Sequence, residues 1–269
     1  MDGAKPVATP MSSSGLSHHT SSPPLSNGTD YWRLVGSLQC LSLTRLDISF
    51  AVNKLSLYTH CPTEMHWQVV KRILRYLKHT MCHVLLIRPT SSLVPHAFSD
   101  SDWAGDKDTC VSTIGYIVFL GATPISWKAS KQKVVAQSST KAKYRALATA
   151  SFGLVWVLHL LTELGFPIGA LPVLYCDNVG TTYLSSNLVM HSRMKHIAID
   201  FHFIRDLVDR KILRVSHIAS ADQLADGLTK PLSSSQFALL CSKIGVADGS
   251  TILRRHIKET HNTAASIMA

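Results

Sequence analysis

Apolar residues recur every three to four positions along residues 44–58 and 63–78, which predicts two helices near the start of the chain. The second helix is expected to begin at Thr63, because threonine is a common N-cap residue and an acidic residue follows it. A short strand is predicted over residues 82–87. The prolines of the stretch 89–95 predict a boundary between this helical part and the rest of the chain.

Short apolar runs alternate with longer helical patterns beyond that boundary. The short runs predict strands over residues 96–99, 115–120, 125–128, 172–176 and 212–218. The helical patterns cover residues 138–164, 179–185, 195–210 and a last helix from residue 221. This order predicts an α/β fold, in which a mixed five-stranded sheet is flanked by helices and preceded by a small helical part.

The composition of successive stretches predicts four parts of the chain. Residues 1–30 are rich in Ser, Pro, Thr and Gly, so we expect a disordered leader, and they lack the apolar run of a signal peptide. Residues 31–90 are the helical part, residues 95–235 the α/β domain, and residues 236–269 a C-terminal helix and tail. The sequence does not say whether the helical part packs on the sheet.

Composition and charge narrow the class of protein. Hydrophobic residues make up 46% of the 269, enough for a sizeable core, and the formal net charge is +10. A basic chain indicates either a solvated basic surface or a nucleic-acid partner, and charge alone leaves both open. The six cysteines form no Cys-x-x-Cys pair, which argues against a zinc knuckle or a disulfide framework. The longest apolar run, residues 152–161, is too short to span a bilayer, so we expect an intracellular protein with no membrane partner.

Three aspartates stand where side chains of an α/β domain converge. Asp100 and Asp177 each follow a predicted strand, and Asp226 lies in a helix-like segment after the last strand. Carboxylate oxygens suit Mg²⁺, and two such ions about 4 Å apart clamp the attacking and leaving oxygens of a phosphodiester. Each aspartate taken singly has an ordinary explanation: a turn, a helix cap or an exposed helix residue. Only their combination points to a metal site.

Two groups of basic residues are candidates for nucleic-acid binding. Lys71, Arg72, Arg75 and Lys78 share one face of the second predicted helix. Arg193, Lys195 and His196 lie at the start of the helix predicted over residues 195–210 or just before it. A solvated helix face is the ordinary reading of such residues, and contact with the phosphate backbone is the functional one.

Several motifs then occur in one order along the chain. They include Phe98-Ser99-Asp100-Ser101-Asp102-Trp103, Ser138-Ser139-Thr140-Lys141-Ala142-Lys143-Tyr144, Cys176-Asp177-Asn178 and Asp222-Gln223-Leu224-Ala225-Asp226. To about residue 246 the chain resembles the C-terminal end of the reverse transcriptase and the RNase H domain of copia-type LTR-retrotransposon Pol polyproteins. The resemblance implies an RNase H fold that hydrolyses the RNA strand of RNA–DNA hybrids with two Mg²⁺ or Mn²⁺ ions. It also implies that Asp100, Asp177 and Asp226 are the catalytic, metal-binding aspartates, and that residues 31–90 are a remnant without polymerase carboxylates.

The chain departs from the family at the fourth acid. Where the family has glutamate on the long helix, this sequence has Lys143, and Lys141 replaces a second glutamate two positions earlier. An ammonium there removes a ligand, repels cations, and can pair with Asp100 or Asp177 in the place of an ion. We therefore expect hydrolysis to be lost or reduced, as in a truncated, degenerate copy of the element.

Three interpretations remain open at this stage. The chain is an active or residually active RNase H, a catalytically dead RNase H-like fold that binds nucleic acid, or a pseudogene product with no role. The family places such a domain in the cytoplasm, within virus-like particles, or in the nucleus. The sequence leaves the oligomeric state open.

Overall fold

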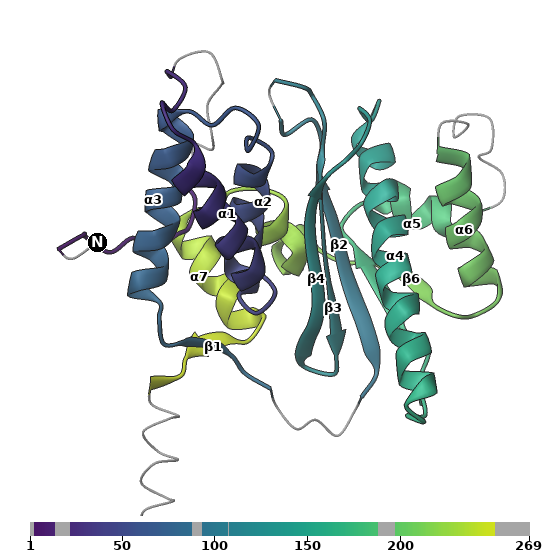
Figure 1. The fold of residues 1–269 in the computed structure, drawn as a ribbon. Coiled ribbons are helices and arrows are strands. Elements are labelled where there is room, and N and C mark those ends of the chain that lie inside the picture. Colours follow the sequence, from purple (N-terminus) through teal and green to yellow (C-terminus); the bar gives the residue numbers. More distant parts are fainter. Residues whose placement is uncertain (1–2, 14–21, 88–92, 107, 188–196, 251–269) are drawn as a thin grey trace, which may run out of the picture.

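The computed structural model describes residues 3–13, 22–87, 93–106, 108–187 and 197–250 of the chain. Five strands form a mixed sheet in the order β4-β3-β2-β5-β6, with helices on both faces (Figure 1). The strands are β2 (Pro95–Asp102), β3 (Thr113–Leu120), β4 (Thr123–Lys131), β5 (Val173–Cys176) and β6 (Arg214–His217). The predicted mixed five-stranded sheet flanked by helices is confirmed.

The order of the strands follows from their connections. β2, β3 and β4 form an antiparallel meander, and Gly121 at φ 58° makes the tight turn between β3 and β4. β2, β5 and β6 run parallel, so the chain must cross over between them, and it does so through helices. β2 therefore lies in the middle of the sheet and β4 at its edge.

Three helices cover one face of the sheet. They are α4 (Ser139–Glu163), α5 (Val179–Ser186) and α6 (Ala198–Asp209). The Ser138 side chain caps α4 by accepting from the Lys141 backbone N–H, and Gly165 at φ 73° follows its end. Of the described helices, α4 alone is long and apolar enough to cross a membrane by length and composition. Its inner residues, such as Tyr144, Leu147 and Leu154, pack in the core against the sheet.

A helical layer covers the opposite face. It consists of α1 (Thr29–Leu41), η2 (Leu46–Ile48), α2 (Ser49–Ser56), α3 (Glu64–His79) and α7 (Ser234–Lys243). Its apolar residues share one core with Ile117 and Phe119 of β3. Figure 1 shows this layer on the side of the sheet away from α4. β1 (His83–Leu85) pairs with β7 (Val246–Asp248), which joins the segment after α3 to the segment after α7. The helical part therefore docks on the sheet, a question that the sequence left open.

Two sequence predictions need correction. The leader is not disordered where it is described: Thr9 and Met11 are 4% exposed, and residues 23–25 hydrogen bond to residues 62–64 because apolar side chains there cover the helical layer. The last helix does not start at residue 221. Two short 3₁₀ segments, η5 (Ser220–Asp222) and η6 (Leu224–Leu228), come first, and α7 begins only at Ser234 behind its own cap, Ser233. The predicted tail beyond residue 250 lies outside the described residues.

Candidate catalytic centre

Asp100 and Asp177 are brought together by the parallel pairing of β2 and β5. In that register Phe98 lies opposite Tyr175. Asp100, near the end of β2, and Asp177, just after β5, therefore lie together where these parallel strands end. Open α/β sheets form their sites at these carboxyl ends of the strands. The segment η6 packs on β2 and β3 and carries Asp226 to the same place.

Lys143 lies at the centre of this group. It is near the start of α4, and its Nζ is 3.1 Å from Oδ1 of Asp100 and 2.5 Å from Oδ1 of Asp177. The Lys143 side chain is 16% exposed, that of Asp100 is 3% exposed, and that of Asp177 is 8% exposed. The ammonium therefore bridges two carboxylates in a site that is largely closed to water.

Asp226 completes the cluster from the other side. The Thr229 hydroxyl donates to Oδ2 of Asp100 at 2.6 Å, and Lys230 Nζ pairs with Oδ2 of Asp226 at 2.8 Å. The Asp226 side chain is 18% exposed. The structure thus gathers Asp100, Lys143 and Asp177, with Asp226 adjoining, as the sequence predicted. Their predicted catalytic and metal-binding roles stay a prediction.

The ionisation of Lys143 and Asp100 is mutually reinforced. Burial alone would raise the pKa of Asp100, but the charge of Lys143 and the hydrogen bond from Thr229 outweigh it and hold that pKa below its ordinary value. Burial would likewise lower the pKa of Lys143, but Asp100 and Asp177 outweigh it and raise that pKa. Both groups are therefore charged at neutral pH.

Asp226 behaves in the opposite way. Burial raises its pKa to about 6, and the neighbouring Asp100 carboxylate adds to the rise, while Lys230 opposes it. The attraction of Lys230 thus does not offset the desolvation of the Asp226 carboxylate. Keeping this carboxylate ionised therefore lowers the stability of the fold, as is common at functional sites.

The cluster does not fit two divalent cations while Lys143 holds its place. Its three carboxylates, Asp100, Asp177 and Asp226, already face two ammonium groups, Lys143 and Lys230. Two divalent ions would add four more positive charges beside the Lys143 ammonium, and a carboxylate ligand is missing there. Within the described residues, no group of three or more His, Cys, Asp or Glu side chains is arranged to hold a metal ion.

Two contributors to the cluster were not assigned a role from sequence. Thr229 and Lys230 follow shortly after Asp226 in the sequence, but only the structure shows that Thr229 donates to Asp100 and that Lys230 pairs with Asp226. The spacing of four between Asp226 and Lys230 is the signal that was available, because such pairs meet on a helical turn. Gln223 was also missed: its amide donates to the Ser99 carbonyl at 3.0 Å and anchors η6 to β2.

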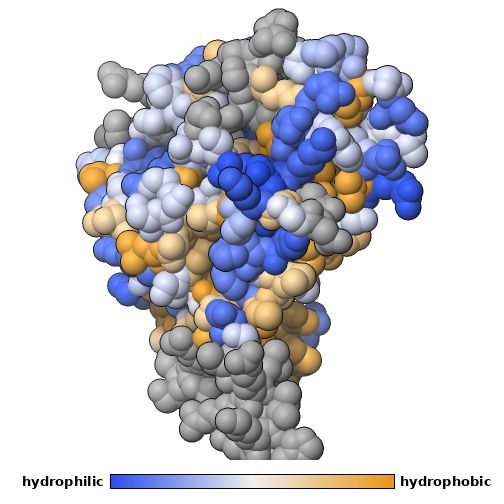
Figure 2. Space-filling view, turned by 90° about the vertical axis from the view of Figure 1, so that its left-hand side faces the viewer, coloured by the Kyte–Doolittle hydropathy of each residue, from blue (hydrophilic) through white to orange (hydrophobic). Residues whose placement is uncertain are grey.

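The predicted basic residues have different surroundings. Arg72 is engaged by the leader, donating to the Thr9 carbonyl at 3.2 Å and to the Thr9 hydroxyl at 2.8 Å. Lys71 lies over the Trp67 ring, 5.7 Å from its centroid. Lys71, Arg75 and Lys78 belong to α3 in the helical layer, whose outer face carries a broad band of hydrophilic residues (Figure 2). Arg193, Lys195 and His196 lie outside the described residues.

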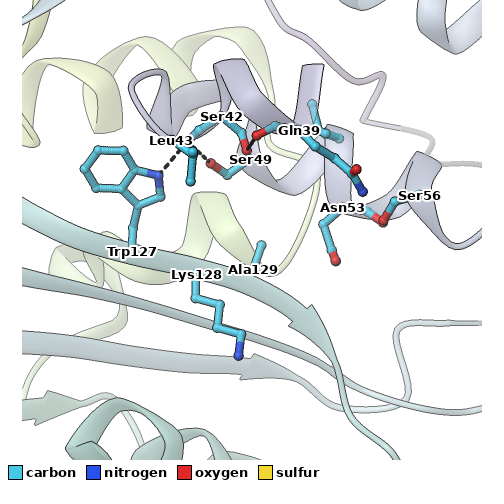
Figure 3. A pocket seen from close by; sticks show the side chains of 10 residues that line it. Gln39, Ser42, Leu43, Ser49, Asn53, Ser56, Trp127, Lys128 and Ala129 are labelled. Carbon is cyan, nitrogen blue, oxygen red and sulfur yellow. Dashed lines mark hydrogen bonds between the residues drawn. The ribbon is translucent and has the colours of Figure 1, made fainter. Parts of the chain in front are cut away.

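A pocket separate from the aspartate cluster lies between the helical layer and β4. It has a volume of about 230 Å³, and its lining includes Ser49, Asn53 and Trp127 (Figure 3). The Trp127 indole donates to the Ser42 carbonyl at 2.9 Å, which fixes β4 to α1. Its ten lining residues include no carboxylate, so this pocket offers no acid–base pair and no ligand set for a divalent ion.

Comparison with known proteins places the chain in a family. It is 56% identical over 243 residues to the retrovirus-related Pol polyprotein from transposon RE1 of Arabidopsis thaliana, a match that covers 90% of this chain and 17% of that polyprotein. It is 34% identical to the corresponding polyprotein from transposon TNT 1-94 of Nicotiana tabacum, over 91% of this chain and 19% of that protein. The chain thus spans less than a fifth of the length of these relatives. No protein-family model matches it.

Solved structures resemble the chain only weakly. LC11-RNase H1, isolated from compost, aligns with a TM-score of 0.40 at 16% identity, covering 51% of this chain and 93% of that one. Membership therefore rests on the polyprotein relatives and on the motifs that the chain shares with copia-type elements. The chain belongs to the family of retrovirus-related Pol polyproteins encoded by transposons.

Proposed function

We propose that the five-stranded domain is the RNase H-like domain of such a polyprotein, with its hydrolytic centre converted into a closed ion-pair cluster. The ancestral reaction is hydrolysis of the RNA strand of an RNA–DNA hybrid, with Mg²⁺ or Mn²⁺ as the family's cofactor. The observation that carries the proposal is the Lys143 ammonium lying between Asp100 and Asp177. Those two residues, with Asp226, match the family's catalytic aspartates.

The electrostatic argument is direct. A divalent ion about 4 Å from an ammonium is repelled by about 8 kcal/mol at an effective dielectric constant of about 20. The same ammonium satisfies the two carboxylates that the ion would need, so the ion must also displace it. Lys143 thus takes the place of a cation as the positive group that neutralises Asp100 and Asp177.

The partner that this surface favours is nucleic acid. A formal net charge of +10 and the exposed Lys71 and Lys78 of α3 provide an electrostatic footprint for a phosphate backbone. On this proposal the protein acts inside the cell as a binder of hybrid or duplex. The alternative is a pseudogene product with no role. In that case we expect no salt-dependent affinity for nucleic acid.

Cleavage of an end-labelled RNA–DNA hybrid in Mn²⁺ tests the proposal. The unchanged protein is expected to cleave no faster than the buffer control, whereas Lys143→Glu, which restores the acid, is expected to bind Mn²⁺ and to give detectable cleavage. Lys143→Glu combined with Asp100→Asn is the matched control and should cleave nothing.

Two results would contradict the proposal. Robust Mn²⁺-dependent cleavage by the unchanged protein would show that Lys143 does not block the site. A Lys143→Glu variant that folds but binds no metal would show that the aspartates do not form a latent metal site. Separately, affinity for the hybrid should fall steeply with salt, and a flat dependence would favour the product with no role.

A further inference from the structure

The outer side of α4 carries an exposed apolar stripe. Phe152, Trp156 and Leu160 are 70%, 61% and 40% exposed, and their spacing of four places them along one side of the helix. Ile199 of α6 is 87% exposed, and the Phe203 ring lies 5.7 Å from that of Phe152. Two helices thus contribute to one apolar patch.

The patch is hollowed into a groove of about 600 Å³. Its floor includes Tyr116 of β3 and Gly153 of α4. A Cβ at Gly153 would lie 3.0–3.1 Å from the Tyr116 ring, so the missing side chain lets the ring lie directly against the helix. A groove of this size with aromatic walls accepts large apolar side chains.

The charges around the groove argue against nucleic acid as its occupant. Residues 146–163 contain no lysine or arginine, although the whole chain has a formal net charge of +10. The preceding residue, Arg145, already faces Asp200 within the same subunit, so it is not a free cation for a phosphate. Lys128 on β4 and Asp200 on α6 both line the groove. Because α4 packs on β2 and β3 and has α6 beside it, β4 and α6 lie on opposite sides of α4. The Lys128 side chain points away from the helical layer, toward the α4 side of the sheet (Figure 3).

We propose that this groove is the contact face of a homodimer. The exposed parts of Phe152, Trp156, Leu160 and Ile199 amount to roughly 500 Å², taking about 150–250 Å² for a large side chain. That is more than half of the about 800 Å² that each partner buries in a standard interface.

Charge selects the arrangement of the two copies. In one arrangement the two-fold axis lies in the plane of contact and runs parallel to α4, which places Lys128 of each copy over Asp200 of the partner subunit. In the other arrangement the axis lies in the same plane but runs perpendicular to α4, which places Lys128 over Lys128 and Asp200 over Asp200. The parallel arrangement of the two α4 helices is therefore the favoured one. It involves none of the residues of the aspartate cluster, so it stands independently of the proposed function.

Sedimentation velocity over about 1–100 µM, the range in which micromolar dimers dissociate, tests the proposal. The unchanged protein is expected to shift from monomer to dimer over this range, and Trp156→Glu to stay monomeric. Leu239→Ser on α7, where Leu239 is 58% exposed in the other helical layer, is the matched control and should dimerise normally. Circular dichroism of each variant establishes that it is folded.

The charge pair gives a second, independent readout. Lys128→Glu should weaken the dimer about tenfold, since two symmetric attractions at partly exposed, salt-screened positions become two repulsions. Adding Asp200→Lys should restore the affinity. An unchanged protein that is monomeric throughout, including one that binds phospholipid vesicles as a monomer, would overturn the proposal. So would a Trp156→Glu variant that dimerises like the unchanged protein.

Discussion

Replacing Lys143 by methionine removes the ammonium while keeping much of the side chain's volume. The two ion pairs, at 3.1 and 2.5 Å, each represent about 5–7 kcal/mol of Coulomb attraction at an effective dielectric constant of about 20. Most of that is offset by the cost of burying three charges, and removing one partner of a buried pair typically leaves a net loss of about 3–5 kcal/mol. We expect Lys143→Met to lower the free energy of unfolding by that amount at pH 7.

The pH dependence of this loss has a definite sign. The lowered pKa of Asp100 means that its ion pair stabilises the fold above the ordinary carboxyl pKa and stops doing so as the pH falls through the folded value. The raised pKa of Lys143 keeps the ammonium charged throughout that range. The difference between the unchanged protein and Lys143→Met should therefore shrink in acid.

Urea denaturation in EDTA and in Mg²⁺ measures the effect. Once the ammonium is absent, Mg²⁺ should bind the freed carboxylates and raise the stability of Lys143→Met, while leaving the unchanged protein unaffected. Lys141→Met is the matched control, because Lys141 lies on the same helix and its ammonium only contacts Gln137 at the surface. A Lys143→Met protein as stable as the control, or equal stabilisation of the unchanged protein by Mg²⁺, would refute the reasoning.

Three further substitutions test other parts of the structure. Burial opposes ionisation of Asp106, but Lys131 and Lys54 hold its pKa at about 2, so Asp106→Asn should cost about 2 kcal/mol at pH 7. Most of that cost should be lost by pH 2 in urea titrations, where the carboxylate is half protonated. A pH-independent cost would count against this. Asp226→Asn should instead stabilise the protein by about 2 kcal/mol at pH 8, because the raised pKa of Asp226 makes its carboxylate unfavourable above pH 6. The gain in stability should vanish at pH 3, and a loss of stability at pH 8 would exclude this explanation. Gly115→Ala would place a Cβ 2.7 Å from that of Leu228 and push η6 off the sheet, so thermal unfolding should show a loss of stability of about 1–3 kcal/mol. Unchanged stability would mean that η6 can shift without cost.

The sheet was predictable because its strands are apolar runs between clear turn signals. β3 is buried along nearly its whole length, and a strand with two covered faces reads as a continuous apolar run. The capped start of α4 at Ser138 and its end before Gly165 were equally readable. The start of α7 was not, because η5 and η6 place Asp222 and Asp226 in short 3₁₀ turns that resemble one longer helix in sequence.

The candidate site was only partly readable. Motif order located Asp100, Asp177, Asp226 and Lys143, and it offered Asp100 or Asp177 as the partner of the lysine. That the lysine contacts both at once was not readable, since it depends on the register of β2 against β5. The engagement of Arg72 by Thr9 depends on a leader whose composition indicates disorder. Long-range contacts of this kind leave no local pattern in the sequence.

The central claim is that the Lys143 ammonium occupies the place of the cations, and titration of Mn²⁺ followed by electron paramagnetic resonance tests it most directly. The unchanged protein is expected to leave all added Mn²⁺ free, whereas Lys143→Glu should bind it and lose that binding when Asp177→Asn is added. Stoichiometric binding of two Mn²⁺ ions by the unchanged protein would contradict the account.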